Sequence, residues 1–172
     1  MQTGQPQSNN PPPPIEPTGF FTGIKIVPIV MGIVVDVVAT IVMSTFYYFI
    51  FVAKEFTEKS LSEEGLAEYW SSSEGVMVSL VLGTLGTVIG GFFAARRAGL
   101  LEIKHGALVG VGSIALGIIL QSGGEESMPL NEWQMMIAYA AAIPAGALGG
   151  ALAEMLRGAT INPASGGSWK NR

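Results

Sequence analysis

The sequence predicts an all-α integral membrane protein whose four helices form a transmembrane bundle. Of its 172 residues, 49% are hydrophobic and only 13% are charged, and glycine occurs 23 times. This composition is typical of a membrane protein rather than of a soluble domain. Four apolar stretches are long enough to cross a hydrocarbon core, for which about 20 residues suffice. Since that core offers no water to backbone groups, each stretch is expected to be a helix.

The predicted elements follow one another in a simple order. Residues 1–21 are dense in Pro, Gln and Asn and lack Lys and Arg, so we expect a disordered, Pro-rich cytoplasmic tail. A transmembrane domain then covers residues 22–157, and residues 158–172 form a second disordered cytoplasmic tail. The four spans are expected at residues 23–52, 76–95, 103–120 and 133–156. The first is too long for one perpendicular crossing, so it is expected to tilt or to extend beyond the membrane.

The loop between the first and second spans has a helical pattern of its own. Ser60 followed by Glu63 forms a capping box, which is typical of a helix start. Leu61, Leu66 and Trp70 could then lie against the bilayer surface. We therefore expect a short interfacial helix in this loop.

The basic residues predict the direction of the spans. Seven of the nine lie at the start of the first span, in the turn between the second and third spans, or after the fourth. The other two loops are acidic or contain no basic residue, and six Tyr and Trp residues cluster towards their side. Because Lys and Arg mark cytoplasmic loops and aromatic side chains favour the interface, both termini are expected in the cytoplasm.

Glycine and other small residues recur every four positions in the second, third and fourth spans. Lipid tails are as apolar as leucine, so helices in a membrane associate through close backbone contact, which small residues allow. Helix packing is therefore predicted at Gly32, Gly83, Gly90, Gly91, Gly106, Gly110, Gly117, Gly146 and Gly150. The alternative is that these faces of small residues line a permeation path. Helix packing is the commoner use of such faces.

One carboxylate, Asp36, lies in the middle of the first span. Gly32, Thr40 and Ser44 share its side of the helix, because they recur every four residues. A charged group that faces lipid costs at least about 2.5 kcal/mol, so this stripe is expected to face protein.

The depth of Asp36 predicts its neighbours. They are expected to be Thr84 or Thr87, Ser113 and the backbone near Gly146, whereas Arg97 lies too close to the cytoplasmic edge for a direct pair. The predicted intramembrane polar site thus consists of Asp36, Thr40, Ser44, Thr87 and Ser113. Its role is either a structural hydrogen-bond anchor, which we favour, or a site for proton or cation movement.

Basic residues at the cytoplasmic edge have a separate role. Arg96, Arg97, Lys104 and Arg157 are expected to set the topology and to touch anionic lipid headgroups. Arg157 is three residues from Glu154 on the last helical turn, so the two are also expected to pair.

Several kinds of site are not expected. The chain has no cysteine and a single histidine, so an oriented nucleophile and base cannot be assembled, and neither catalytic residues nor an enzymatic activity is predicted. No clustered ligands for a metal occur within a span, and no phosphate-cradling loop is present, so no metal and no cofactor is expected. A sequence pI of about 4.9 argues against a nucleic acid as partner, which normally needs a basic face.

The stretch GTLGTVIGGFFAARRAGLLEIKHGALVGVGSIALG, residues 83–117, together with the acidic residue in the first span, resembles a set of small bacterial four-span membrane proteins. The shared features are a Gly-Gly segment, an Ala-Ala-Arg end and a following HGALVG start in a glycine-rich second and third span. Those proteins have no established activity. The resemblance therefore implies the topology and a multi-pass location in a bacterial inner membrane, and it implies no site residues.

Two functions are compatible with these features. The favoured one is a non-enzymatic structural or accessory membrane protein that packs with itself, as a homo-oligomer, or with a larger membrane complex. The alternative is a small oligomeric transporter or channel that moves protons or cations by way of Asp36.

Overall fold

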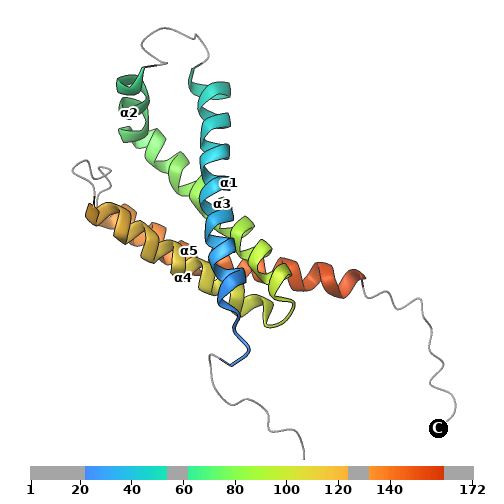
Figure 1. The fold of residues 1–172 in the computed structure, drawn as a ribbon. Helices are drawn as coiled ribbons and strands as arrows, with labels where there is room; N and C mark the ends of the chain where they lie inside the picture. Colours follow the sequence, from blue (N-terminus) through green and yellow to red (C-terminus); the bar gives the residue numbers. More distant parts are fainter. Residues whose placement is uncertain (1–21, 54–61, 124–131, 161–172) are drawn as a thin grey trace, which may run out of the picture.

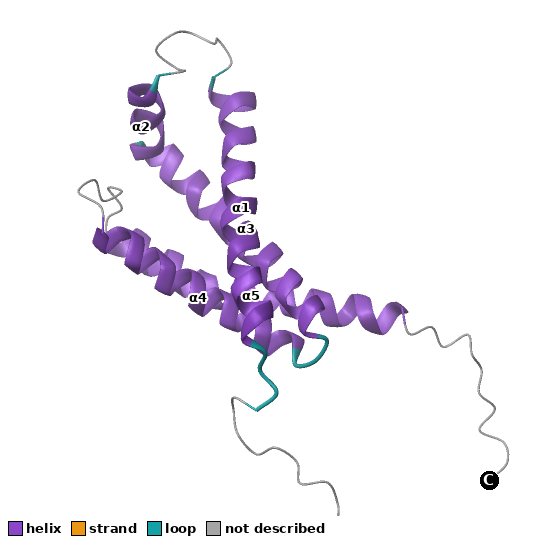
Figure 2. Ribbon diagram, in the orientation of Figure 1, coloured by secondary structure: helices purple, strands orange, loops and turns teal. Residues whose placement is uncertain are grey.

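The computed structural model describes residues 22–53, 62–123 and 132–160 of the chain. Within these ranges every regular element is a helix (Figure 2). The elements are α1 (Ile26–Tyr47), a π-helical turn that continues it (Tyr48–Val52), α2 (Glu63–Ser71), α3 (Ser73–Ala98), α4 (Glu102–Gly123) and α5 (Glu132–Thr160). The predicted all-α fold is confirmed.

Four of these helices are long and apolar enough to cross a membrane, as predicted. They cover Ile26–Val52, Ser73–Ala98, Glu102–Leu120 and Trp133–Gly158. The first begins later than residue 23, because Gly23 has a φ of 83° and Lys25 has an extended backbone. The predicted disordered tail at residues 1–21 and most of the one at residues 158–172 lie outside the described residues.

Helices α2 and α3 meet at Ser72, which ends the first and begins the second. Its backbone is extended, and its Oγ accepts a hydrogen bond from the N–H of Gly75 at 3.1 Å. Such a cap satisfies one of the donors that the first turn of a helix leaves unpaired. Ser62 caps α2 in the same way by accepting from Gly65. The loop thus contains a short helix that Ser62 caps, and the expected cap residue, Ser60, lies outside the described residues.

An aromatic cluster joins α2 to the end of the first candidate span. Tyr48 is buried, and its ring centroid lies 5.7 Å from that of Tyr69 and 6.2 Å from that of Trp70. Separations and tilts of this kind are favourable for aromatic rings. Burial, together with the neighbouring Tyr47 side chain, also raises the pKa of Tyr69 above its ordinary value.

The core lies towards one end of the four long helices. In Figure 1 they cross near the start of α1 and the α3–α4 turn, whereas α1 and the α4–α5 pair diverge away from it. We call the region of the crossing, which contains the start of α1 and the α3–α4 turn, the turn end. The opposite region, where α1 and the α4–α5 pair diverge, is the α2 end. Most buried positions belong to the turn end. They are Pro28, Gly32 and Asp36 of α1, and a part of the residues in each of three segments: Gly86 to Ala98 of α3, Glu102 to Gly110 of α4 and Ala145 to Ala153 of α5.

The α3–α4 turn is tight because Gly99 adopts a left-handed backbone. Its φ is 75°, and its N–H donates to the carbonyl of Ala95 at 3.2 Å. Glycine is the usual residue at this position after a helix, since a side chain there would be strained. The turn brings the end of α3 and the start of α4 together at the core.

Candidate functional site

Asp36 lies between three helices and accepts hydrogen bonds from hydroxyl groups. Only 5% of the residue is exposed. Its Oδ2 accepts from Thr87 of α3 at 3.1 Å and from Ser113 of α4 at 2.5 Å. On its own helix, the Oγ1 of Thr40 lies 3.5 Å from Oδ1, which is long for a hydrogen bond. The carboxylate therefore joins α1 to α3 and to α4, mainly through Thr87 and Ser113.

Two glycines of α3 allow this approach. A Cβ atom at Gly86 would lie 2.8 Å from Oδ1 of Asp36, and one at Gly90 would lie 2.8 Å from its Cβ. Real Cβ contacts essentially never come so close. The hydrogen bonds of Asp36 thus depend on the glycine face of α3 that packs against α1.

Each of the two main donors also reaches a second acceptor. The Thr87 hydroxyl lies 3.0 Å from the carbonyl of Gly83, and the Ser113 hydroxyl lies 3.0 Å from the carbonyl of Val109. A hydroxyl has one proton, so it donates either to Asp36 or to its own helix. The site can therefore hold a carboxylate, to which the hydroxyl protons of Thr87 and Ser113 both point. It can also hold a carboxylic acid, which donates to one of the two hydroxyl oxygens while each hydroxyl donates to the carbonyl of its own helix. Neither state requires a heavy atom to move.

The other predicted neighbours of Asp36 lie elsewhere. Ser44 is half-buried one turn beyond Thr40 and makes no hydrogen bond to Asp36. The hydroxyl of Thr84 donates to the carbonyl of Leu80 at 2.7 Å. Gly146 packs against α3 and α4, because α5 contacts these two helices rather than α1. The intramembrane polar site thus contains four of its five predicted residues.

Most of the predicted packing glycines lie in close backbone contact. A Cβ at each of the following would come within 3.0 Å of a neighbouring helix: Gly32, Gly90, Gly91, Gly106, Gly110, Gly146 and Gly150. Gly149 belongs to the same set, since its Cβ would meet the backbone of Val88, although the four-residue pattern does not contain it. Gly83 and Gly117 do not take part: among the described residues, the nearest atom to a Cβ at Gly117 is 3.9 Å away, and none lies within 4 Å at Gly83.

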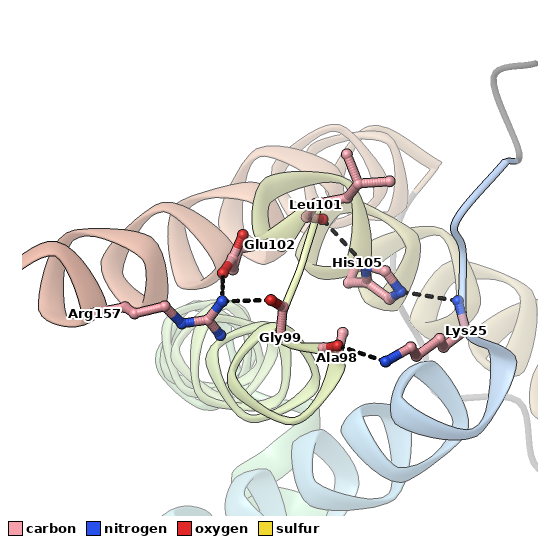
Figure 3. Close-up of polar contacts among 7 residues, drawn as sticks. All are labelled: Lys25, Ala98, Gly99, Leu101, Glu102, His105 and Arg157. Carbon is pink, nitrogen blue, oxygen red and sulfur yellow. Dashed lines mark hydrogen bonds and ion pairs between the residues drawn. The ribbon is translucent and has the colours of Figure 1, made fainter. Parts of the chain in front are cut away.

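A second polar cluster fixes the start of α1 at the turn end. His105 is fully buried; its Nδ1 lies 3.0 Å from the carbonyl of Leu101, and its Nε2 accepts from the backbone N–H of Lys25 at 3.0 Å (Figure 3). This pairing requires the neutral tautomer with the proton on Nδ1. The Lys25 ammonium donates to the carbonyl of Ala98 at 3.0 Å. Two polar contacts thus hold α1 to the α3–α4 turn.

Arg157 of α5 completes the cluster from the other side of the turn. Its Nη1 donates to the carbonyl of Gly99 at 2.6 Å and pairs with the carboxylate of Glu102 (Figure 3). The expected pair with Glu154 is replaced, because the side chain of Glu154 is exposed while Glu102 lies at the packed turn. Only Arg157 of this cluster is among the predicted site residues. The signal in the sequence from which its pair with Glu102 could have been predicted is the opposite charge at the start of the third span and at the end of the fourth.

The remaining predicted basic residues lie at the same end. Arg96 and Arg97 are exposed on the last turn of α3, and Lys104 is half-buried on the first turn of α4. Within the described part of the chain, no group of three or more His, Cys, Asp or Glu residues could hold a metal ion. A comparison with protein-family models, with curated proteins and with solved structures finds no match for this chain.

Proposed function

We propose that the protein is a non-enzymatic, multi-pass membrane protein with a structural or accessory role. The observation that supports this role is that the hydroxyl groups around Asp36 all come from the chain's own candidate spans. Hydrogen bonds between membrane helices contribute about 0.6 kcal/mol on average and up to about 1.7 kcal/mol. Thr87 and Ser113 therefore provide a modest but directional link that fixes how α1 meets α3 and α4.

The glycine faces serve this same purpose within the chain. Seven of the nine predicted packing glycines contact another helix of the same protein, so association with a second copy or with a larger complex would use other surface. Of the nine predicted packing glycines, Gly83 and Gly117 are the two without close backbone contact among the described residues, so these two predicted positions remain open.

One observation favours a second function, the movement of protons. Because Thr87 and Ser113 each reach both Asp36 and a backbone carbonyl, the site accommodates a carboxylate and a carboxylic acid equally well in geometry. Intramembrane carboxylates commonly belong to proton relays. Four spans seldom enclose a path, so this function requires an oligomer.

Flux measurements separate the two functions. We expect liposomes that contain the wild-type protein to show the same proton and cation permeability as liposomes that contain Asp36→Asn, because an anchor moves no ion. The measurement is the decay of an imposed pH or cation gradient, with a protonophore as the positive control. A wild-type flux that the Asn variant abolishes would contradict the structural role and support the second function.

We also propose that the turn end faces the cytoplasm and that α2 lies at the opposite interface, in a bacterial inner membrane. The support is the positive charge of the turn end, where Lys25, Arg96, Arg97, Lys104 and Arg157 lie. The aromatic cluster of Tyr48, Tyr69 and Trp70 marks the other end, as interfacial aromatic side chains do.

Single cysteines test this orientation in the cysteine-free chain. Ser73→Cys, which is exposed at the start of α3, is expected to react with an impermeant thiol reagent on intact cells. Leu100→Cys, which is 40% exposed in the α3–α4 turn, is expected to react only after permeabilisation. Leu100 is preferable to Gly99, because the φ of 75° at Gly99 strains any side chain. The opposite pattern of labelling would invert the proposed topology.

A further inference from the structure

A small hollow lies at the turn end between the last turns of α3 and α5. Its volume is about 220 Å³, and its walls are formed by Arg96 of α3 and by Ala153, Leu156 and Arg157 of α5. Two arginines from facing helices thus line this space, and its other two lining residues are apolar. Both helices end here, at the level where a membrane protein meets lipid headgroups.

Arg157 is held in place by its contacts with the α3–α4 turn. Its Nη1 contacts the carbonyl of Gly99 and the carboxylate of Glu102, which is only 9% exposed. A fixed guanidinium loses less conformational freedom when it binds an anion than a mobile one does. The hollow therefore has one preorganised cation.

Arg96 provides a second cation with free donors. Its guanidinium carbon lies 6.0 Å from the ring centre of Phe92, a cation–π contact that uses none of its N–H groups. Among the described residues, no hydrogen bond or ion pair occupies those groups. Arg97, the next residue, is also an exposed arginine at the end of α3, but it does not line the hollow.

The charges nearest the hollow match a singly charged anion. Two guanidinium groups and the carboxylate of Glu102 leave one net positive charge, which matches the single negative charge of a phosphodiester. Guanidinium groups bind phosphate oxygens in pairs through parallel N–H donors. Ala153 and Leu156 offer apolar contact for the glycerol and upper acyl carbons of a lipid, which a free phosphate lacks.

We propose that this hollow is a binding site for the headgroup phosphodiester of an anionic phospholipid. The proposal concerns a site other than Asp36 and does not depend on the structural role. Basic pockets between membrane helices on the cytoplasmic side bind such headgroups by the same chemistry. The site differs from general attraction to a charged bilayer, because Arg96 takes part and Arg97 does not.

The test compares two neighbouring arginines on one helix. The purified wild-type protein, Arg96→Gln and Arg97→Gln are mixed in detergent with phosphatidylglycerol or phosphatidylcholine, and native mass spectrometry measures the bound lipid. We expect the wild type to retain one phosphatidylglycerol in preference to phosphatidylcholine. Arg96→Gln is expected to weaken this retention at least about tenfold, since a hydrogen bond to a charged group is lost. Arg97→Gln is expected to stay within about twofold of the wild type.

A second variant does not depend on Arg96. Leu156 is 51% exposed, and Leu156→Glu places a carboxylate on the wall of the hollow, so it should abolish the preference for phosphatidylglycerol as well. Equal losses in Arg96→Gln and Arg97→Gln would reduce the effect to general surface charge and overturn the proposal. Displacement of the lipid by millimolar inorganic phosphate would also overturn it, since the ligand would then be the free anion.

Discussion

Replacing Gly106 with alanine is expected to force α4 away from α5 and to lower the free energy of unfolding by about 1 to 3 kcal/mol, the usual cost of overpacking. A Cβ at this position would lie 2.8 Å from the backbone nitrogen of Gly150 and closer still to the carbonyl of Gly146. These neighbours are backbone atoms of another helix, so they cannot turn aside as a side chain could. The measurement is unfolding in mixed micelles, followed by tryptophan fluorescence.

The matched control is the same substitution on the same helix at Gly117. The nearest atom to a Cβ there is Cε1 of Tyr139 at 3.9 Å, an ordinary van der Waals distance, so Gly117→Ala should not destabilise the protein. Alanine also has a higher helix propensity than glycine, by about 1 kcal/mol in water. Wild-type stability in Gly106→Ala would show that α4 and α5 do not approach this closely.

The helices themselves could be predicted from the sequence because their signals are local. A run of about 20 apolar residues must form a helix in lipid whatever its neighbours are. Small residues at four-residue spacing mark a face that suits close packing, which is why Gly106, Gly110, Gly146 and Gly150 were predictable. The position of Asp36 in its span also set the depth of its partners, and Thr87 and Ser113 follow from it.

What the sequence leaves open depends on how the helices cross. Gly83 and Gly117 fit the packing pattern, but among the described residues neither is in close contact with the backbone of another helix. The pairing of Arg157 with Glu102 instead of Glu154 depends in the same way on the third and fourth spans meeting at the turn end. A local pattern shows which face of a helix can pack, and only the crossing geometry decides how much of that face does so.

Asp36→Leu is expected to lower the free energy of unfolding by about 2 to 4 kcal/mol. Loss of the links to Thr87 and Ser113 accounts for about 1 kcal/mol, at about 0.6 kcal/mol for each hydrogen bond between membrane helices. Overpacking adds the larger part, because a leucine methyl group in the place of Oδ2 would lie only 2.5 Å from the hydroxyl oxygen of Ser113 and 3.1 Å from that of Thr87. The same unfolding measurement as for Gly106 gives the value.

Two smaller substitutions separate these contributions. Asp36→Ala removes the hydrogen bonds without adding bulk, and the Thr87 and Ser113 hydroxyls can then donate to the carbonyls of Gly83 and Val109, so no buried donor is left unpaired. Its cost should therefore stay near 1 kcal/mol. Asp36→Asn should cost less still, because its amide oxygen in the place of Oδ2 can accept from both hydroxyls, while its amide nitrogen takes the place of Oδ1 beside the Oγ1 of Thr40. If Asp36→Leu proved as stable as the wild type, the side chain would not lie between the helices, and its role as an anchor would be wrong.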